Sequence, residues 1–227
     1  MHLLKKIPCA QVELSWDHEL TGHDEGRSRQ LRGALAGTFA DDDLFHQHDP
    51  MSGKPLYRYP LVQYRWRAGR GLVIGWGDAA GRLLGLPWLD LELQLGEETV
   101  TVGDAALTLH HGQFGVSERL LHYRLATPVL LFNSENYRRY QGMDETLQRV
   151  ERDRLLVSNL LIALRGLDVH FPERLYATFS QIRTQPCRYK GQELLGISGE
   201  LACNAVIPDG LAFGHAVSHG FGWLAVG

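Results

Sequence analysis

The chain has 227 residues, of which 44% are hydrophobic, and its formal net charge at pH 7 is −3. This length allows one large domain or two small ones with a packed core. No run approaches the roughly 20 apolar residues of a membrane span, no signal-peptide core is recognisable, and three cysteines without a C-x-x-C pair argue against a disulfide framework. We therefore expect a cytoplasmic protein with reduced thiols. Residues 1–118 hold 11 Lys and Arg against 16 Asp and Glu, whereas residues 119–227 hold 12 against 10, so the second half is the better candidate for contact with nucleic acid.

The first half of the chain is predicted to run strand, helix, strand, strand, short helix, strand. Apolar and polar residues alternate where strands are expected, and a four-residue spacing of Leu31, Leu35 and Phe39 predicts the first helix. Two apolar runs joined by a glycine-containing turn are typical of a hairpin. The predicted elements are a strand over 12–16, a helix over 25–39, a hairpin of 61–66 and 72–76, a short helix within 77–86, and strands within 91–109.

The second half has a similar strand, helix, strand, strand order after a predicted linker at 110–116, which contains two glycines. A strand is expected around 121–125, and a helical region over about 134–167 has Asp144 as a candidate cap for its long part. The predicted apolar stripe of this helix is Leu147, Val150, Val157, Leu161 and Leu164. Further strands are expected at 176–188 and 194–206. The shared order predicts an α+β chain of two tandem ferredoxin-like modules with antiparallel sheets, over 1–112 and 117–227.

Residues 210–222 form a glycine-rich segment near the end of the sequence. Glycine permits positive φ and a close approach of backbone to a ligand, and successive N–H groups in such a loop can cradle phosphate oxygens. A nucleotide-binding loop would open a long helix, for which few residues remain here, so the segment suits a nucleic-acid backbone better. A glycine-rich hairpin without a ligand is the alternative. The candidate contacts are Gly210, Gly214, His215, Ser218, His219, Gly220, Phe221 and Gly222.

A polar segment, 45–60, separates the first helix from the following strand and holds the residues best suited to catalysis. RNA cleavage without a metal needs a base for the ribose 2′-OH, an acid for the leaving 5′-oxygen, and a cation for the phosphorane. Histidine suits acid and base roles because its ordinary pKa is about 6.5. The candidates are His46 and His48 as acid and base, Tyr57 and Tyr59 as donors or positioners, and Lys54 or Arg58 as the cation.

The histidine pair has two other interpretations. His46 and His48 could belong to a zinc site with Asp43 or Asp49 as a third ligand, although no further ligand stands nearby at a strong spacing. The histidines could also form only local hydrogen bonds within a loop. Our prediction is a site without a metal or another cofactor.

Together, the two segments resemble the CRISPR-associated repeat-processing endoribonucleases of the RAMP superfamily. The C-terminal part of the resemblance consists of Gly196–Leu201, Asn204, Pro208 and the segment 210–222. The N-terminal part consists of His46-x-His48, Lys54 and the residues 57–64, as in the branch of the family with a histidine pair in its N-terminal domain. The family implies two ferredoxin-like (RRM-related) domains, binding of CRISPR precursor RNA at its repeat, and metal-independent cleavage that leaves a 2′,3′-cyclic phosphate.

The resemblance also implies roles for individual residues. His46 and His48 would act as acid and base, Tyr57 or Tyr59 as a second acid or positioner, and Lys54 as a charge stabiliser. The segment 210–222 and the region of Arg183, Arg188 and Lys190 would contact the RNA. A homodimer and assembly with other CRISPR-associated subunits are both left open. The alternatives are a non-catalytic RNA-binding RAMP subunit of a CRISPR effector complex, which would not need paired histidines, and a two-domain protein unrelated to RNA.

Overall fold

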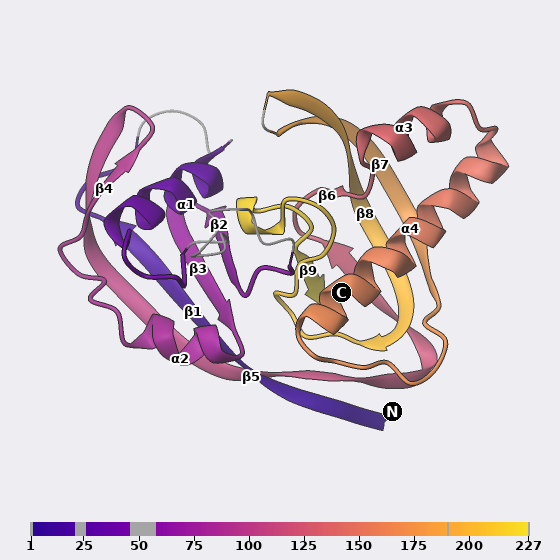
Figure 1. The fold of residues 1–227 in the computed structure, drawn as a ribbon, viewed down its shortest axis with the longest axis horizontal. Helices are drawn as coiled ribbons and strands as arrows, with labels where there is room; N and C mark the ends of the chain where they lie inside the picture. The colour runs from indigo at the N-terminus through magenta and orange to yellow at the C-terminus, as the bar shows by residue number, and fades with distance from the viewer. Residues whose placement is uncertain (1, 21–25, 46–57, 190, 227) are drawn as a thin grey trace. The chain divides into compact units, whose positions relative to one another are not determined.

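The computed structural model describes residues 2–20, 26–45, 58–189 and 191–226 of the chain (Figure 1). The strand pairings within this part are antiparallel, so the chain has an α+β fold with antiparallel sheet. The chain divides into an N-terminal unit, Ile7–His111 with Ser218–Gly220, and a C-terminal unit, Met1–Lys6, Gly112–Val217 and Phe221–Gly227. The long strands β1 (His2–Trp16) and β5 (Glu98–Leu125) contribute residues to both units. None of the described helices is long and apolar enough to cross a membrane.

The N-terminal unit contains the elements that were expected for the first half of the chain. These are α1 (Arg27–Thr38), β2 (Val62–Arg67), β3 (Arg70–Trp76), α2 (Asp78–Leu84) and β4 (Glu92–Leu95), together with parts of β1 and β5. The strands follow the order β2-β3-β1-β5. Ala68 and Gly69 join β2 to β3 with φ of 50° and 76°, as a tight two-residue hairpin turn requires.

The core of the N-terminal unit lies where α1 packs on the sheet. Leu31 and Leu35 are fully buried because their four-residue spacing places them on one face of α1. Val12 and Leu14 of β1 belong to the same core cluster. This packing fixes α1 against β2, which is the pair of elements on which the candidate site depends.

The C-terminal unit has β8 at the centre of its sheet. Its elements are β6 (Val129–Leu130), α3 (Ser134–Gln141), α4 (Glu145–Gly166), β7 (Ala177–Tyr189), β8 (Gln192–Val206) and β9 (Leu224–Val226). Leu201 of β8 pairs with Tyr123 of β5 on one side and Phe179 of β7 on the other. β9 pairs with β5, and a short 3₁₀ turn (Val217–His219) lies between β8 and β9.

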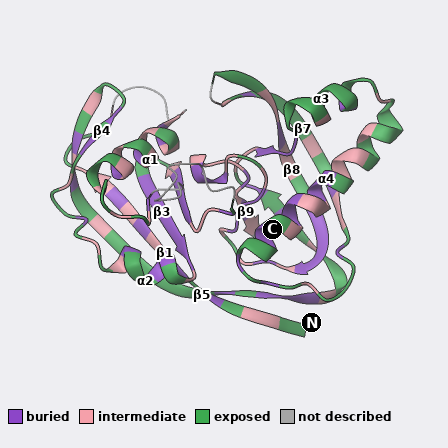
Figure 2. Ribbon diagram, in the orientation of Figure 1, coloured by how far each residue is buried: buried purple, intermediate pink, exposed green. Residues whose placement is uncertain are grey.

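Helix α4 confirms the predicted cap and corrects the predicted stripe. The Asp144 carboxylate accepts a hydrogen bond from the Leu147 N–H at 2.9 Å. Leu147 and Val150, which were expected in the core, are 52% and 61% exposed. Figure 2 shows both exposed and buried residues along α4. The helix has apolar residues on several sides, so periodicity alone does not choose the face that packs against β7, where Asp153 binds the Phe179 N–H. The residues that α4 buries are Leu155, Leu156, Asn159, Leu160, Ala163 and Leu164.

The linker predicted at 110–116 is wrong, because β5 continues through these residues from Glu98 to Leu125. Gly115 marks a close approach of two strands instead of a break. A Cβ at this position would lie 2.5 Å from the His2 carbonyl oxygen of β1. Glycine is therefore required by the packing of the backbone.

Candidate active site

Most of the residues predicted to carry out the chemistry lie outside the described residues: His46, His48, Lys54 and Tyr57. The described residues on either side of their segment are Phe45 and Arg58. Phe45 is buried, and its ring stacks on that of Phe39 with centroids 4.9 Å apart. The Arg58 side chain is exposed. The positions at which the chain enters and leaves the segment 46–57 are therefore defined.

Tyr59 belongs to a buried chain of polar side chains. Its hydroxyl accepts a hydrogen bond from the Gln63 amide at 2.9 Å, and the Gln63 carbonyl oxygen accepts one from Arg65 Nη2 at 2.9 Å. Successive side chains of a strand point to opposite faces, so Gln63 and Arg65 lie on the face of β2 opposite Tyr64. The Tyr59 hydroxyl thus has a partner inside the protein, and its role in catalysis stays a prediction.

A pocket of about 110 Å³ lies in the N-terminal unit. Both neighbours of the segment 46–57, Phe45 and Arg58, contribute to its wall, and so do residues of α1, β2 and α2. Its wall includes both apolar and charged side chains. The lining residues are Arg32, Asp43, Leu44, Phe45, Arg58, Leu61, Val62, Tyr64, Asp78, Ala79, Arg82 and Ser218.

Tyr64 is the most deeply buried polar side chain of this pocket, with an exposed fraction of 2%. Its hydroxyl has no hydrogen-bond partner among the described residues. Burial raises the pKa of the phenol well above its usual value, and the nearby Arg32 charge opposes the rise only in part. The hydroxyl therefore remains protonated, and able to donate, at neutral pH.

The charges of the pocket fall into two groups. Arg82 is held by two carboxylates: its Nη2 atom donates to Asp43 Oδ1 at 2.7 Å and also contacts Asp42. The guanidinium lowers the pKa of the Asp43 carboxyl, which therefore stays ionised. Arg32 and Arg58 form no hydrogen bond or ion pair within the described part of the chain, although the charge of Arg58 also helps to lower the pKa of the Asp43 carboxyl.

The glycine-rich segment reaches the same unit as this pocket. Ser218–Gly220 belong to the N-terminal unit, and Ser218 lines the pocket with a side chain that is 8% exposed. Gly220 has a φ of 93°, and a Cβ there would lie 2.7 Å from Ser28 Oγ on α1. Two segments that are far apart in the sequence therefore meet here: the neighbours of 46–57 and a part of 210–222.

Elsewhere in the glycine-rich segment, the glycines are explained by packing of the protein on itself. A Cβ at Gly222 would lie 1.9 Å from the Phe213 carbonyl oxygen. A Cβ at Gly214 would lie 2.8 Å from the Leu130 carbonyl oxygen. His215 is exposed, its N–H donates to Leu130 O at 2.8 Å, and partial desolvation lowers the pKa of its imidazole. These residues shape the segment, and their contact with RNA stays a prediction.

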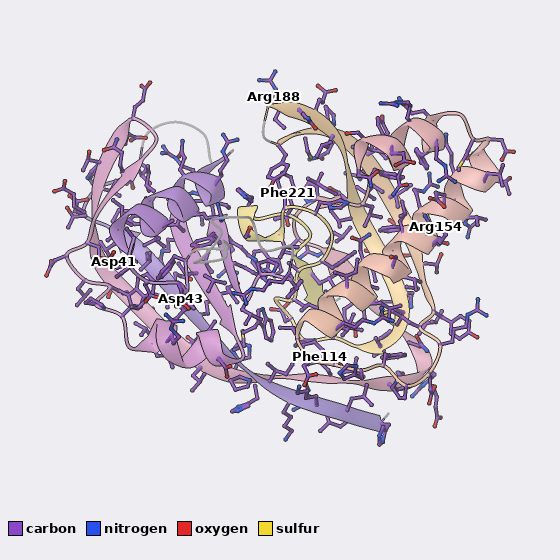
Figure 3. The ribbon with its side chains drawn as sticks, in the orientation of Figure 1. Asp41, Asp43, Phe114, Arg154, Arg188 and Phe221 are labelled. Carbon is purple, nitrogen blue, oxygen red and sulfur yellow. The ribbon has the colours of Figure 1, made fainter. Side chains whose placement is uncertain are left out.

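The predicted basic region on β7 is divided between two faces. Arg183 and Arg188 are both exposed and pair with Ser198 and Glu193 of β8. They are five positions apart in a regularly paired part of the strand, so their side chains point to opposite faces. Arg188 lies near the end of the hairpin (Figure 3). Lys190 lies outside the described residues. Arg183 and Arg188 are thus not brought together on one surface.

Arg32 and Tyr64 were not predicted as site residues. Arg32 follows an apolar position of α1, and Tyr64 sits in a strand whose neighbours are mostly buried, so both resemble ordinary members of a helix and a strand. They are singled out only by the pocket they share and by the Tyr64 hydroxyl, which lacks a hydrogen-bond partner in the described part of the chain. In the described part of the chain, no group of three His, Cys, Asp or Glu side chains could hold a metal ion.

Comparisons with known proteins agree over nearly the whole chain. The family described as the Cas6b N-terminal domain matches residues 5–113, and the Cas6b C-terminal domain matches residues 115–226. An uncharacterized protein of Methanocaldococcus jannaschii is 32% identical over 131 residues, which are 58% of this chain and 89% of that protein.

Solved structures share the fold. A crystal structure of Cas6b superimposes with a TM-score of 0.84 at 24% identity, covering 98% of this chain and 100% of that one. A structure described as the CRISPR RNA processing endoribonuclease Cas6b gives a TM-score of 0.71 at 24% identity, covering 97% and 100%. Because the two domain families match in order and together span the chain, it belongs to Cas6b, a family of CRISPR RNA processing endoribonucleases.

Proposed function

We propose that the protein cleaves CRISPR precursor RNA within its repeat by attack of a ribose 2′-OH, without a metal ion, and leaves a 2′,3′-cyclic phosphate. His46 and His48 are the proposed acid and base, Lys54 the proposed cation, and Tyr57 and Tyr59 the proposed positioners. The observation that carries this proposal is the pocket in the N-terminal unit. Phe45 and Arg58, which flank the histidine segment, line it together with Ser218 of the glycine-rich segment.

The proposed reaction balances without a co-reactant. One histidine takes the proton of the 2′-OH, whose oxygen then attacks the phosphorus atom. The bond to the 5′-oxygen breaks, and the second histidine, protonated, gives its proton to this leaving group. Imidazoles with pKa values near 6.5 can serve both roles at neutral pH. A cation near the phosphorane stabilises the charge that develops on its oxygens.

We further propose that both halves of the chain are ferredoxin-like modules, 1–112 and 117–227. In the N-terminal unit the order β-α-β-β-α-β and the sheet order β2-β3-β1-β5 agree with this fold. In the C-terminal unit, β5, α4, β7, β8 and β9 follow the same plan, with β8 between β5 and β7 and with β9 on β5. The segment 207–223, which includes the glycine-rich residues, then occupies the place of the second helix.

The proposed partner is CRISPR repeat RNA. The RNA-binding surface would include the glycine-rich residues Gly210, Gly214, His215, Ser218, His219, Gly220, Phe221 and Gly222, with Arg183, Arg188 and Lys190. Because Arg183 and Arg188 point to opposite faces of β7, we expect only one of them to contact a given RNA segment. Substituting each separately by glutamine and measuring RNA affinity tests this expectation, since replacing the residue that touches phosphate should also reduce the salt dependence of binding.

The test of the reaction is incubation of the purified protein, in EDTA, with repeat RNA from its own host. We expect a single cut and a 2′,3′-cyclic phosphate end on the upstream fragment. The double variant His46→Ala/His48→Ala should lose cleavage while keeping its melting temperature and its affinity for RNA. His110→Ala/His111→Ala is the matched control, because this neighbouring pair lies on β5 and should be dispensable.

Three outcomes would contradict the proposal in different ways. Full activity of the His46/His48 double variant would remove these residues from the site. Loss of cleavage in EDTA would favour the metal-dependent alternative. Tight binding of repeat RNA that is never cut would favour a non-catalytic RNA-binding subunit. A deoxyribose at the nucleotide before the cut should abolish cleavage, because it removes the attacking oxygen.

A further inference from the structure

The Tyr64 hydroxyl is the feature of the pocket that requires an explanation. Buried polar atoms in folded proteins are nearly always hydrogen-bonded, and an unpaired one marks a functional group or a missing ligand. Tyr64 is 2% exposed, has no hydrogen-bond partner among the described residues, and lines the pocket. Because its phenol stays protonated, the group that would satisfy it is a hydrogen-bond acceptor.

The charges around this hydroxyl identify the kind of acceptor. Among the described residues, the pocket lining holds three arginines, Arg32, Arg58 and Arg82, and two carboxylates, Asp43 and Asp78. Arg82 is bound to Asp43 and also to Asp42, whereas Arg32 and Arg58 form no ion pair within the described part of the chain. The acceptor that suits these two guanidiniums is negatively charged.

We propose that this pocket binds one phosphodiester group of the RNA at or next to the cut, with the Tyr64 hydroxyl donating to a phosphate oxygen and the Arg32 and Arg58 guanidiniums pairing with its charge. This inference rests on the proposed function, because it takes the RNA as the source of the phosphate. The position next to the cut follows from Phe45 and Arg58, which flank the histidine segment and line the pocket.

The size and walls of the pocket fit this occupant. Its volume of about 110 Å³ exceeds the roughly 30 Å³ that one water occupies in the liquid, so it admits a group of several heavy atoms. Leu44, Phe45, Leu61 and Val62 form apolar walls. Apolar walls exclude water and strengthen the interaction between a guanidinium and a phosphate. Guanidiniums match the geometry of phosphate oxygens through paired N–H donors.

Neutral phosphate analogues test the proposal directly. A series of repeat RNAs would each carry one methylphosphonate, which removes the charge of a single linkage. At one linkage at or next to the cut, this change should lower the affinity of the wild-type protein about tenfold to hundredfold, as expected for loss of hydrogen bonds to a charged group. The variants Tyr64→Phe and Arg32→Gln should bind that modified RNA and the unmodified RNA with nearly equal affinity.

The control variant is Arg165→Gln, which replaces an exposed arginine in the last turn of α4. In this variant the methylphosphonate at that linkage should lower the affinity for RNA as much as it does in the wild type. The proposal would be overturned if the methylphosphonate lowered the affinity of the wild type and of Tyr64→Phe equally at every linkage. It would also be overturned if the two proteins differed in this loss only at linkages remote from the cut. Affinities are measured on RNA blocked by a 2′-deoxy nucleotide, so the result does not depend on catalysis. If the wild type does not cut RNA but the methylphosphonate next to the expected cut lowers its affinity more than that of Tyr64→Phe, the phosphate pocket is supported and the proposed cleavage is wrong.

Discussion

Replacing Tyr64 by phenylalanine should make the free protein more stable. The substitution removes a buried hydroxyl that has no hydrogen-bond partner among the described residues and keeps the aromatic ring in the core. An unsatisfied buried polar group costs about 1–3 kcal/mol of desolvation. Each kcal/mol changes the melting temperature of a chain of this size by about 2–4 °C. We therefore expect the melting temperature to rise by about 2–12 °C, while affinity for RNA falls.

Tyr123 offers a matched control, because the same substitution there should have the opposite effect. Its hydroxyl donates to the Ala205 carbonyl oxygen at 2.9 Å and accepts from the Ile207 N–H at 3.0 Å. Tyr123→Phe therefore leaves two buried backbone groups without their partner, which costs about 1–3 kcal/mol for each group left unsatisfied. Both tyrosines are buried, with exposed fractions of 2% and 4%, and both variants keep the aromatic ring, so the comparison isolates the hydrogen bonds of the hydroxyl.

Differential scanning calorimetry of the two variants and the wild type, without RNA, measures these shifts. A higher melting temperature for Tyr64→Phe and a lower one for Tyr123→Phe would support the reasoning. A comparable fall for both variants would refute it, since Tyr64 would then have a structural hydrogen bond in the free protein and no need of a ligand.

The remaining predictions concern the glycine-rich segment and the thiols. Gly222→Ala should be severely destabilising, because its Cβ would lie 1.9 Å from Phe213 O at a φ of 71°, whereas Gly69→Ala, with φ 76° and no atom within 4 Å, should cost only about 1–2 kcal/mol of left-handed strain. A circular-dichroism melt compares the two. Burial raises the pKa of Cys9 to about 12 and that of Cys203 to about 11, so neither thiol should react with a disulfide reagent at pH 8 until urea unfolds the protein. Rapid reaction of the native protein would contradict this burial.

Elements whose determinants are local were predictable from the sequence. The hairpin of β2 and β3 follows from two apolar runs and a turn in which Ala68 and Gly69 take positive φ. The start of α4 follows from Asp144, whose carboxylate needs only the N–H groups of the next turn. In each case the interactions that decide the structure join residues a few positions apart, so the sequence contains them all.

Elements that depend on distant partners were predicted less well. The face that α4 buries is chosen by β7, which follows it in the chain, and Leu147 and Val150 were wrongly expected on that face. Gly115 was interpreted as part of a linker, although it serves the close approach of β1 and β5. A glycine has the same appearance in a sequence whether it ends a strand or permits one to pass another.

The sequence by itself identified the two segments that matter, because their composition is unusual: histidines, lysine and tyrosines in 46–57, and glycines in 210–222. Their relation to the pocket was decided by tertiary structure alone. Arg32 and Tyr64 are unremarkable in a helix and a strand, and Ser218 lies more than 150 positions further along the chain. They share one pocket because α1 packs on β2 and because Ser218–Gly220 join the N-terminal unit. Packing over such separations leaves no periodicity or spacing in the sequence, so only the folded chain reveals a hydroxyl that has no hydrogen-bond partner among the described residues and shares its pocket with Arg32 and Arg58.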